Sequence, residues 1–190
     1  AYCYGEDGES ERAIAQAIKG RRDAISIASK CGIHWQAGKR QVVNGHPDRL
    51  IEEVKESLLR LQVDHLDLLY LHTPDPKIPI QESAGALRQL LDEGVIQSAG
   101  LSNGNTEDYK LFAEICPLTA CQRHFNMLQQ EIRSELLPYC RSKEIAMVAY
   151  WPLMKGLLTG RMKRNQVFPK TDSRHKYPMF NGDEFQKNLT

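Results

Sequence analysis

The chain has 190 residues, of which 41% are hydrophobic and 26% charged, and its formal net charge is +1. These values are typical of a soluble globular protein and predict a single domain over residues 1–190. The small net charge argues against nucleic acid or an anionic membrane as a partner. No apolar run reaches transmembrane length, and no signal peptide is visible. Five scattered cysteines without a Cys-x-x-Cys pair argue against a zinc site or a disulfide framework and favour a reducing, cytoplasmic setting.

Apolar periodicity predicts alternating helices and strands along the whole chain. The first predicted helix is capped by Ser10 and stops at Gly20. Residues 31–46 are polar and interrupted by glycines, which predicts a long loop. The next helix opens with Pro47 and carries an apolar stripe to Leu61. The predicted strands cover residues 24–29, 65–72, 95–102, 118–122 and 145–150, and the later helices cover 80–94, 106–116 with a Thr106 cap, and 130–143.

This alternation predicts an α/β fold with a parallel sheet, because strands that are apolar on both faces are typically separated by helices. A doubly wound nucleotide-binding protein should carry G-x-G-x-x-G after its first strand, and this chain has no such motif. A barrel is therefore favoured, with the strands adjacent and parallel in chain order. Beyond about residue 160 the local signals for regular structure fade.

Polar or aromatic side chains stand at the C-terminal end of each predicted strand. In a (β/α)₈ barrel these ends converge on one face, where the chemistry takes place. Each residue alone has an ordinary explanation, since a strand-end lysine often reaches for water and Ser-Asn-Gly often makes a turn. Five such strand ends in succession favour a shared site. They carry Lys30, His72, Ser102 with Asn103, Gln122 and Tyr150.

Seven segments of the chain resemble the aldo-keto reductase family. They are AYCYGEDGESERAIAQAI, IASK, LDLLYLHTPDP, EGVIQSAGLSN, CQRHFN, LLPYCRSKEIAMVAYWPLMKGLLTG and SRHKYPMFNGDEFQKNL. The resemblance runs in order over nearly the whole chain. It implies a (β/α)₈ TIM barrel that binds NADPH without the dinucleotide-binding glycine motif. It also implies an oxidoreductase that reduces aldehydes or ketones to alcohols.

The same resemblance implies a barrel that is incomplete at both ends. The family pattern reads Asp-Thr-Ala, two residues, then Tyr, which places Ala1 at its alanine and Tyr4 at its catalytic tyrosine. The Asp and Thr, and the family's first strands, would then precede Ala1. At the other end, FQKNLT would stand before the family's last strand and helix.

Tyr4, Lys30 and His72 are the catalytic residues that the resemblance implies. Hydride transfer to a carbonyl carbon leaves negative charge on the oxygen, which a general acid must protonate. A free tyrosine has a pKa of about 10, and an ammonium group such as that of Lys30 lowers the pKa of a neighbouring phenol. His72 would orient the carbonyl oxygen, and the family's Asp would orient Lys30.

The resemblance also implies contacts to the cofactor. Tyr150 would stack on the nicotinamide ring, while Ser102, Asn103 and Gln122 would bond its carboxamide. The segment WPLMKGLLTGR resembles the pyrophosphate-binding loop, but a tryptophan replaces the usual serine, which puts that hydroxyl contact in doubt. No metal is implied, and NADPH rather than NADH is the habit of the family. The residues implied in and after this loop are Trp151, Pro152, Leu153, Lys155, Gly156, Arg161 and Arg174.

Three alternatives stay open. Some members of the family are binding or regulatory subunits, and an inactive piece of a barrel is a second alternative. The trio of Tyr4, Lys30 and His72 favours an enzyme, because a structural barrel does not need it. A sugar-phosphate isomerase is disfavoured, since no glycine-rich phosphate loop follows a late strand in the sequence. The partner is expected to be a small carbonyl compound of unspecified identity, with Trp35 as a pocket wall, and no oligomeric state is predicted.

Overall fold

The computed structural model describes residues 1–36 and 40–189, and the chain divides into two compact units. The first unit comprises Ala1–Arg123 and Ile132–Val148. The second comprises His124–Glu131 and Ala149–Thr190. The expectation of one domain over the whole chain stays a prediction.

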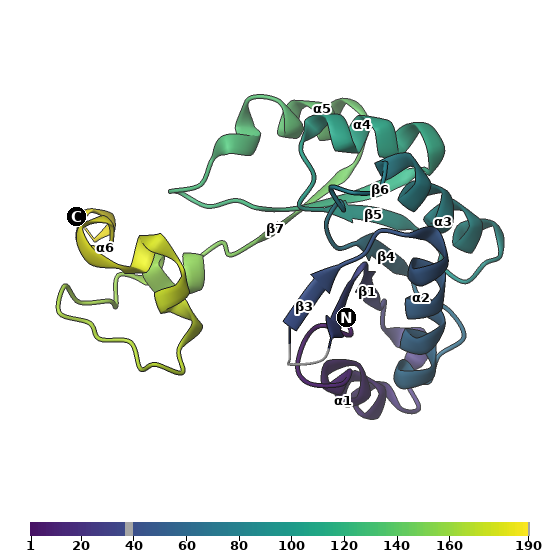
Figure 1. Cartoon of the computed structure of the whole chain (residues 1–190), viewed down its shortest axis with the longest axis horizontal. Coiled ribbons are helices and arrows are strands. Elements are labelled where there is room, and N and C mark those ends of the chain that lie inside the picture. Colours follow the sequence, from purple (N-terminus) through teal and green to yellow (C-terminus); the bar gives the residue numbers. More distant parts are fainter. Residues whose placement is uncertain (37–39, 190) are drawn as a thin grey trace. The chain divides into compact units, whose positions relative to one another are not determined.

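The main sheet consists of β1 (Ala28–Cys31), β4 (Leu68–Leu71), β5 (Ala99–Ser102), β6 (Leu118–His124) and β7 (Ala146–Tyr150). These strands are neighbours in the order β1, β4, β5, β6, β7, which is their order along the chain (Figure 1). Pairing is parallel between β1 and β4, between β4 and β5, and between β5 and β6. The predicted α/β fold of barrel type is confirmed, although the sheet does not close into a barrel within the described residues.

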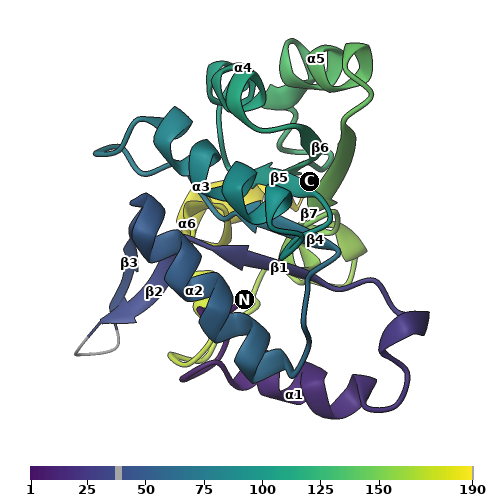
Figure 2. The same ribbon diagram turned by 90° about the vertical axis from the view of Figure 1, so that its right-hand side faces the viewer.

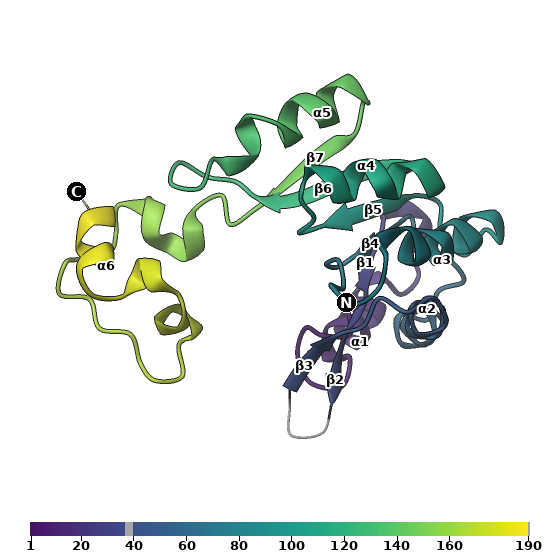
Figure 3. The same ribbon diagram turned by 45° about the horizontal axis from the view of Figure 1, so that its top comes forward.

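The helices of the first unit include α1 (Glu9–Ile18), α2 (Pro47–Leu61), α3 (Ile80–Asp92) and α4 (Thr106–Ile115). They pack against one another in chain order, and Figures 2 and 3 show α2, α3 and α4 following the sequence of the strands. Each helix turns its apolar stripe inward, which creates the core. Its most deeply buried side chains include Leu50, Val54, Leu69, Leu87, Leu90, Leu101 and Phe112.

The starts of two helices differ from the prediction, in the capping residue for α4 and in the position for α5. Asn105 rather than Thr106 caps α4, because its Oδ1 accepts a hydrogen bond of 3.0 Å from the N–H of Asp108. The Asp108 carboxylate accepts in return from the N–H of Asn105 at 2.8 Å, which completes a capping box. Helix α5 (Leu136–Ser142) begins later than predicted. Pro138 therefore lies in its first turn, where the missing N–H is tolerated.

The start of β1 also differs from the predicted strand 24–29. Residues Arg22–Ala24 form a short 3₁₀ turn, so the strand begins at residue 28. Lys30 consequently lies within β1 and not beyond its end. Helix α1 follows Gly8, whose φ of 71° is left-handed and suits glycine, so the predicted Ser10 cap is wrong.

The segment 31–46, predicted as a long loop, contains two strands. β2 (Ile33–Gln36) and β3 (Arg40–Val43) pair antiparallel as a ribbon separate from the main sheet. Residues 37–39 of the predicted loop lie outside the described residues. Each strand has only four residues, which is too short for the alternation of polar and apolar side chains to stand out in the sequence.

The second unit has a small core of its own. Helix α6 (Gly182–Asn188) follows three short 3₁₀ helices, η3 (Met154–Thr159), η4 (Ser173–Lys176) and η5 (Pro178–Phe180). Regular structure thus continues beyond residue 160, contrary to the prediction. The buried members of this core are Met154, Leu157, Phe180 and Phe185. No helix in the described ranges is long and apolar enough to cross a bilayer.

Candidate active site

The three predicted catalytic residues come together in the first unit. Tyr4 precedes α1, Lys30 lies in β1, and His72 directly follows β4. The Tyr4 hydroxyl is 3.4 Å from Nε2 of His72, and Nζ of Lys30 is 5.2 Å from the centre of the Tyr4 ring. Parallel pairing places Lys30 opposite Tyr70, two residues before His72, so adjacent strands deliver both groups to one edge of the sheet.

Burial sets the charge state of this cluster. It lowers the pKa of His72 to about 4, and the nearby Lys30 ammonium adds to the effect. The imidazole is therefore neutral near pH 7. Burial also lowers the pKa of Lys30. Tyr4 remains 47% exposed, unlike the buried Cys3 before it.

The β2–β3 ribbon holds the loop that carries Tyr4. Nε1 of Trp35 donates a hydrogen bond of 3.1 Å to the Gly5 carbonyl, and Nε2 of Gln41 donates one of 2.8 Å to the Cys3 carbonyl. These carbonyls flank Tyr4, so the ribbon fixes the backbone on both sides of the proposed proton donor. Sequence patterns did not single out Gln41 or Cys3, and the role of Trp35 as a pocket wall stays a prediction.

Glu11 of α1 anchors β1 on one side of Lys30. It is fully buried and accepts a hydrogen bond of 3.1 Å from the hydroxyl of Ser29, the residue before Lys30. Nε of Arg60, on α2, lies 2.6 Å from its other carboxylate oxygen. The ion pair therefore ties two helices to the strand that carries Lys30, the predicted catalytic lysine.

Glu53 of α2 anchors the chain on the other side of Lys30. Its carboxylate accepts a hydrogen bond of 2.7 Å from the N–H of Gly32, and Nε of Arg49 lies 3.3 Å away. Burial raises the pKa of Glu53, while the Gly32 N–H and the Arg49 guanidinium oppose that shift. Both buried glutamates were missed in the sequence, because a single glutamate in an amphipathic helix usually faces water.

The residues predicted to bond the carboxamide also lie in the first unit. Ser102 ends β5 and is paired in register with Gln122 of β6. The side-chain amide of Asn103 donates to the His72 carbonyl at 3.0 Å and to Oγ of Ser102 at 3.1 Å. The structure thus connects Ser102 and Asn103 to the predicted catalytic histidine. Hydroxyl and amide groups supply the donors and acceptors that a nicotinamide carboxamide requires, so the set fits that group.

The predicted stacking residue and phosphate loop lie in the second unit. The rings of Tyr150 and Trp151 meet edge to face with centroids 5.6 Å apart. Nζ of Lys155 lies 4.7 Å from the Trp151 ring centre and 4.9 Å from that of Tyr177, so the cation sits near two aromatic rings. Gly156 follows with a left-handed φ of 96°, which favours glycine. Pro152 and Leu153 complete this loop.

The two predicted phosphate-binding arginines differ in their surroundings. Arg174 makes a double contact with Asp172, with Nε 3.0 Å from Oδ1 and Nη2 2.5 Å from Oδ2. These hydrogen bonds lower the pKa of Asp172 to about 2. A phosphate at Arg174 would therefore compete with a carboxylate already in place, whereas Arg161 is exposed. Cofactor contacts by both arginines stay predictions.

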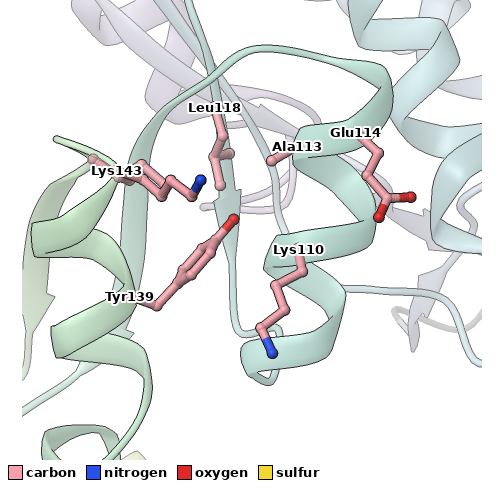
Figure 4. Close-up of a pocket in the computed structure, with 7 residues that line it drawn as sticks. Lys110, Ala113, Glu114, Leu118, Tyr139 and Lys143 are labelled. Carbon is pink, nitrogen blue, oxygen red and sulfur yellow. The ribbon is translucent and has the colours of Figure 1, made fainter.

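A separate open groove of about 590 Å³ lies between α4 and α5 (Figure 4). Tyr139 and Lys143 line one side of this groove, and Lys110 and Glu114 of α4 line the other. Burial raises the pKa of the Tyr139 phenol. The groove contains none of the predicted site residues.

Comparison with known proteins gives a consistent result. The sequence model for the "Aldo/keto reductase family" matches residues 1–190. "Aldo-keto reductase YhdN" of Bacillus subtilis (strain 168) is 35% identical over 192 residues, which cover 100% of this chain and 57% of that protein. "Aldo-keto reductase str7" of Strobilurus tenacellus is 36% identical over 194 residues, which cover 100% of this chain and 55% of that protein. The chain thus spans a little over half the length of these relatives.

Solved structures show the same similarity. The glycerol dehydrogenase AKR11B4 from Gluconobacter oxydans matches with a TM-score of 0.88 and 36% identity, over 96% of this chain and 57% of that one. An aldo-keto reductase from Klebsiella pneumoniae in complex with NADPH matches with a TM-score of 0.65 and 33% identity. This match covers 83% of this chain and 52% of that one. Sequence and fold therefore point to the same group of proteins.

Proposed function

Because the chain belongs to the aldo/keto reductase family, we propose that the protein containing it reduces aldehydes or ketones to alcohols with NADPH. One observation carries the proposal: a tyrosine hydroxyl lies 3.4 Å from a neutral histidine and beside a lysine ammonium. Two comparisons support the cofactor. One solved relative is described in complex with NADPH, and a relative from Schizosaccharomyces pombe is named "Aldo-keto reductase yakc [NADP(+)]".

When bound, NADPH supplies the hydride that adds to the carbonyl carbon. Tyr4 donates its hydroxyl proton to the carbonyl oxygen, which is the general-acid step. The Lys30 ammonium stabilises the phenolate that remains on Tyr4. His72 donates a hydrogen bond to the same oxygen and thereby orients the substrate. Because the imidazole is neutral, it adds no positive charge to compete with Lys30.

The remaining predicted residues would hold the cofactor. Ser102, Asn103 and Gln122 bond the carboxamide, and Tyr150 stacks on the nicotinamide ring. Lys155 offers a cation to the pyrophosphate, in a loop where a tryptophan stands in place of the family's serine. Of the first three, Asn103 donates its side-chain amide to the His72 carbonyl, which supports a shared site for cofactor and substrate.

The test compares three variants of the complete protein. Tyr4→Phe should lower carbonyl reduction by about 10²–10⁴-fold, the usual contribution of a positioned general acid, with NADPH binding nearly unchanged. Tyr70→Phe is the matched control, because this ring also lies near Lys30, with Nζ 5.8 Å from its centre. Tyr150→Ala should instead weaken NADPH binding, since base–aromatic stacking contributes about 1–3 kcal/mol.

Steady-state rates with NADPH and a panel of aldehydes and ketones would be combined with fluorescence titration of the cofactor. Full turnover by Tyr4→Phe would show that another group delivers the proton. A loss of rate in Tyr70→Phe equal to that in Tyr4→Phe would also contradict the assignment, because it would reflect general damage around Lys30.

A further inference from the structure

The imidazole of His72 has a second contact on the side away from Tyr4. Sγ of Cys3 lies 3.5 Å from Nδ1, whereas the Tyr4 hydroxyl lies 3.4 Å from Nε2. Cys3 is only 3% exposed, so its thiol is shielded from bulk water. The histidine therefore stands between a thiol and the proposed proton donor, with one ring nitrogen facing each.

The backbone fixes both partners of this contact. Gln41 donates to the Cys3 carbonyl at 2.8 Å, and the His72 N–H donates to the Cys31 carbonyl at 2.9 Å. The side chain of Asn103 donates to the His72 carbonyl at 3.0 Å. Hydrogen bonds from three different elements thus hold Cys3 and His72 in place. These bonds fix the backbone positions from which the thiol and the ring approach each other.

The charge states leave two possible arrangements of protons. His72 is neutral near pH 7, so one ring nitrogen carries a proton and the other does not. Burial raises the pKa of Cys3, so the sulfur keeps its proton. Either the thiol donates to a bare Nδ1, or a protonated Nδ1 donates to the sulfur. Thiol sulfur is a weak acceptor, whereas an unprotonated imidazole nitrogen is the usual acceptor of a neutral histidine, which favours the first arrangement.

We propose that Cys3 is a positioning residue, whose S–H donates to Nδ1 of His72 and keeps the ring proton on Nε2, facing Tyr4. This inference rests on the proposed function. With the proton on Nε2, His72 donates to the substrate oxygen while Tyr4 keeps its own proton for transfer. With the proton on Nδ1, Nε2 would accept from the Tyr4 hydroxyl and draw that proton away from the substrate.

The test reads the tautomer directly by ¹⁵N NMR of the complete protein, labelled at histidine, near pH 7. Protonated and unprotonated ring nitrogens differ widely in ¹⁵N shift, and the His72 signals are assigned by their loss in His72→Gln. The wild type and Cys3→Ser should both carry the proton on Nε2, because serine retains a hydroxyl donor. Cys3→Ala should shift the population toward Nδ1. Cys31→Ala removes an equally buried thiol that donates to the Tyr70 carbonyl, and should leave His72 unchanged.

Kinetics supply the second readout. Cys3→Ala should lower kcat by about threefold to tenfold, the range for loss of one weak hydrogen bond, with little change in KM. Cys3→Ser should restore kcat. The inference would be overturned if the His72 proton of the wild type were found on Nδ1. It would also be overturned if Cys3→Ala kept that proton on Nε2. The NMR result does not depend on turnover, so it stands even if Tyr4→Phe were to refute the proposed reaction.

Discussion

Replacing Arg60 by methionine should destabilise the first unit, because it removes the guanidinium beside a carboxylate that is cut off from water. The side chain of Glu11 is 1% exposed and that of Arg60 is 17% exposed, with Nε and Oε2 2.6 Å apart. Breaking a buried ion pair by deleting one partner typically costs about 3–5 kcal/mol, since the remaining charge is not compensated.

The other contacts of Glu11 place the expected cost near the lower end of that range. The Ser29 hydroxyl still donates to Oε1 at 3.1 Å, and the nitrogen of Ala1 lies 3.7 Å from the same oxygen. Arg60 also donates to Oγ of Ser57 at 3.2 Å and lies over the ring of Tyr2, contacts that methionine replaces only in part. We expect a loss of about 3 kcal/mol in the free energy of unfolding.

Urea denaturation of the complete protein, followed by circular dichroism, measures this loss. Arg88→Met is the matched control, because Arg88 pairs with Asp92 on the surface, where both side chains are about half exposed. An exposed pair of this kind contributes only about 0–1 kcal/mol. The double variant Glu11→Met with Arg60→Met should recover much of the loss, since no buried charge then remains. If Arg60→Met and Arg88→Met cost the same, the buried pair does not hold β1 as argued.

Two further predictions concern His72 and Gly100. Burial lowers the pKa of His72 from 6.5 to about 4, so below pH 6.5 the unfolded chain binds more protons than the folded chain. The free energy of unfolding therefore decreases as the pH is lowered from 6.5 toward 4. Between pH 7 and 5 the wild type should lose about 2 kcal/mol more than His72→Gln in urea titrations, and parallel curves would refute this. Gly100→Ala should cost about 1–3 kcal/mol, because its Cβ would lie 2.5 Å from the Tyr70 ring. Thermal melting should show the opposite sign for Gly85→Ala, since that helical glycine has open space and alanine favours helix by about 0.5–1 kcal/mol. Equal melting shifts would contradict the packing argument.

The order of the strands in the sheet could be predicted, because it follows from the pattern of apolar residues within neighbouring segments of the chain. The run at 65–72 is apolar on both faces, and helices with clear stripes precede and follow it, which is the pattern of a parallel sheet. Strand ends were less predictable. Residues 24–29 looked like a strand from composition, but a 3₁₀ turn at Arg22–Ala24 delays β1, and Lys30 lies inside it.

The residues that support the site could not be predicted, because their partners are distant in sequence. Gln41 bonds a carbonyl 38 residues away, and Arg60 bonds a carboxylate 49 residues away. Nothing in the neighbourhood of Glu11 distinguishes it from a solvent-exposed helical glutamate. Cys3 likewise reads as one of five scattered thiols until His72 is placed beside it. Sequence patterns predict which groups would carry the chemistry, whereas the contacts that orient them depend on tertiary structure.

The failed loop prediction at 31–46 has a physical reason that bears on function. A short ribbon at this position contributes little to the core, but it donates hydrogen bonds to both carbonyls that flank Tyr4. Proton transfer requires the donor and acceptor to be held within hydrogen-bond reach, and a displacement of about 1 Å can cost 100-fold in rate. Tyr4 lies in the loop before α1 and is 47% exposed, so the backbone on either side of it needs restraint. The ribbon supplies that restraint from outside the sheet, just as Glu11 and Glu53 supply it for Lys30 from the helices.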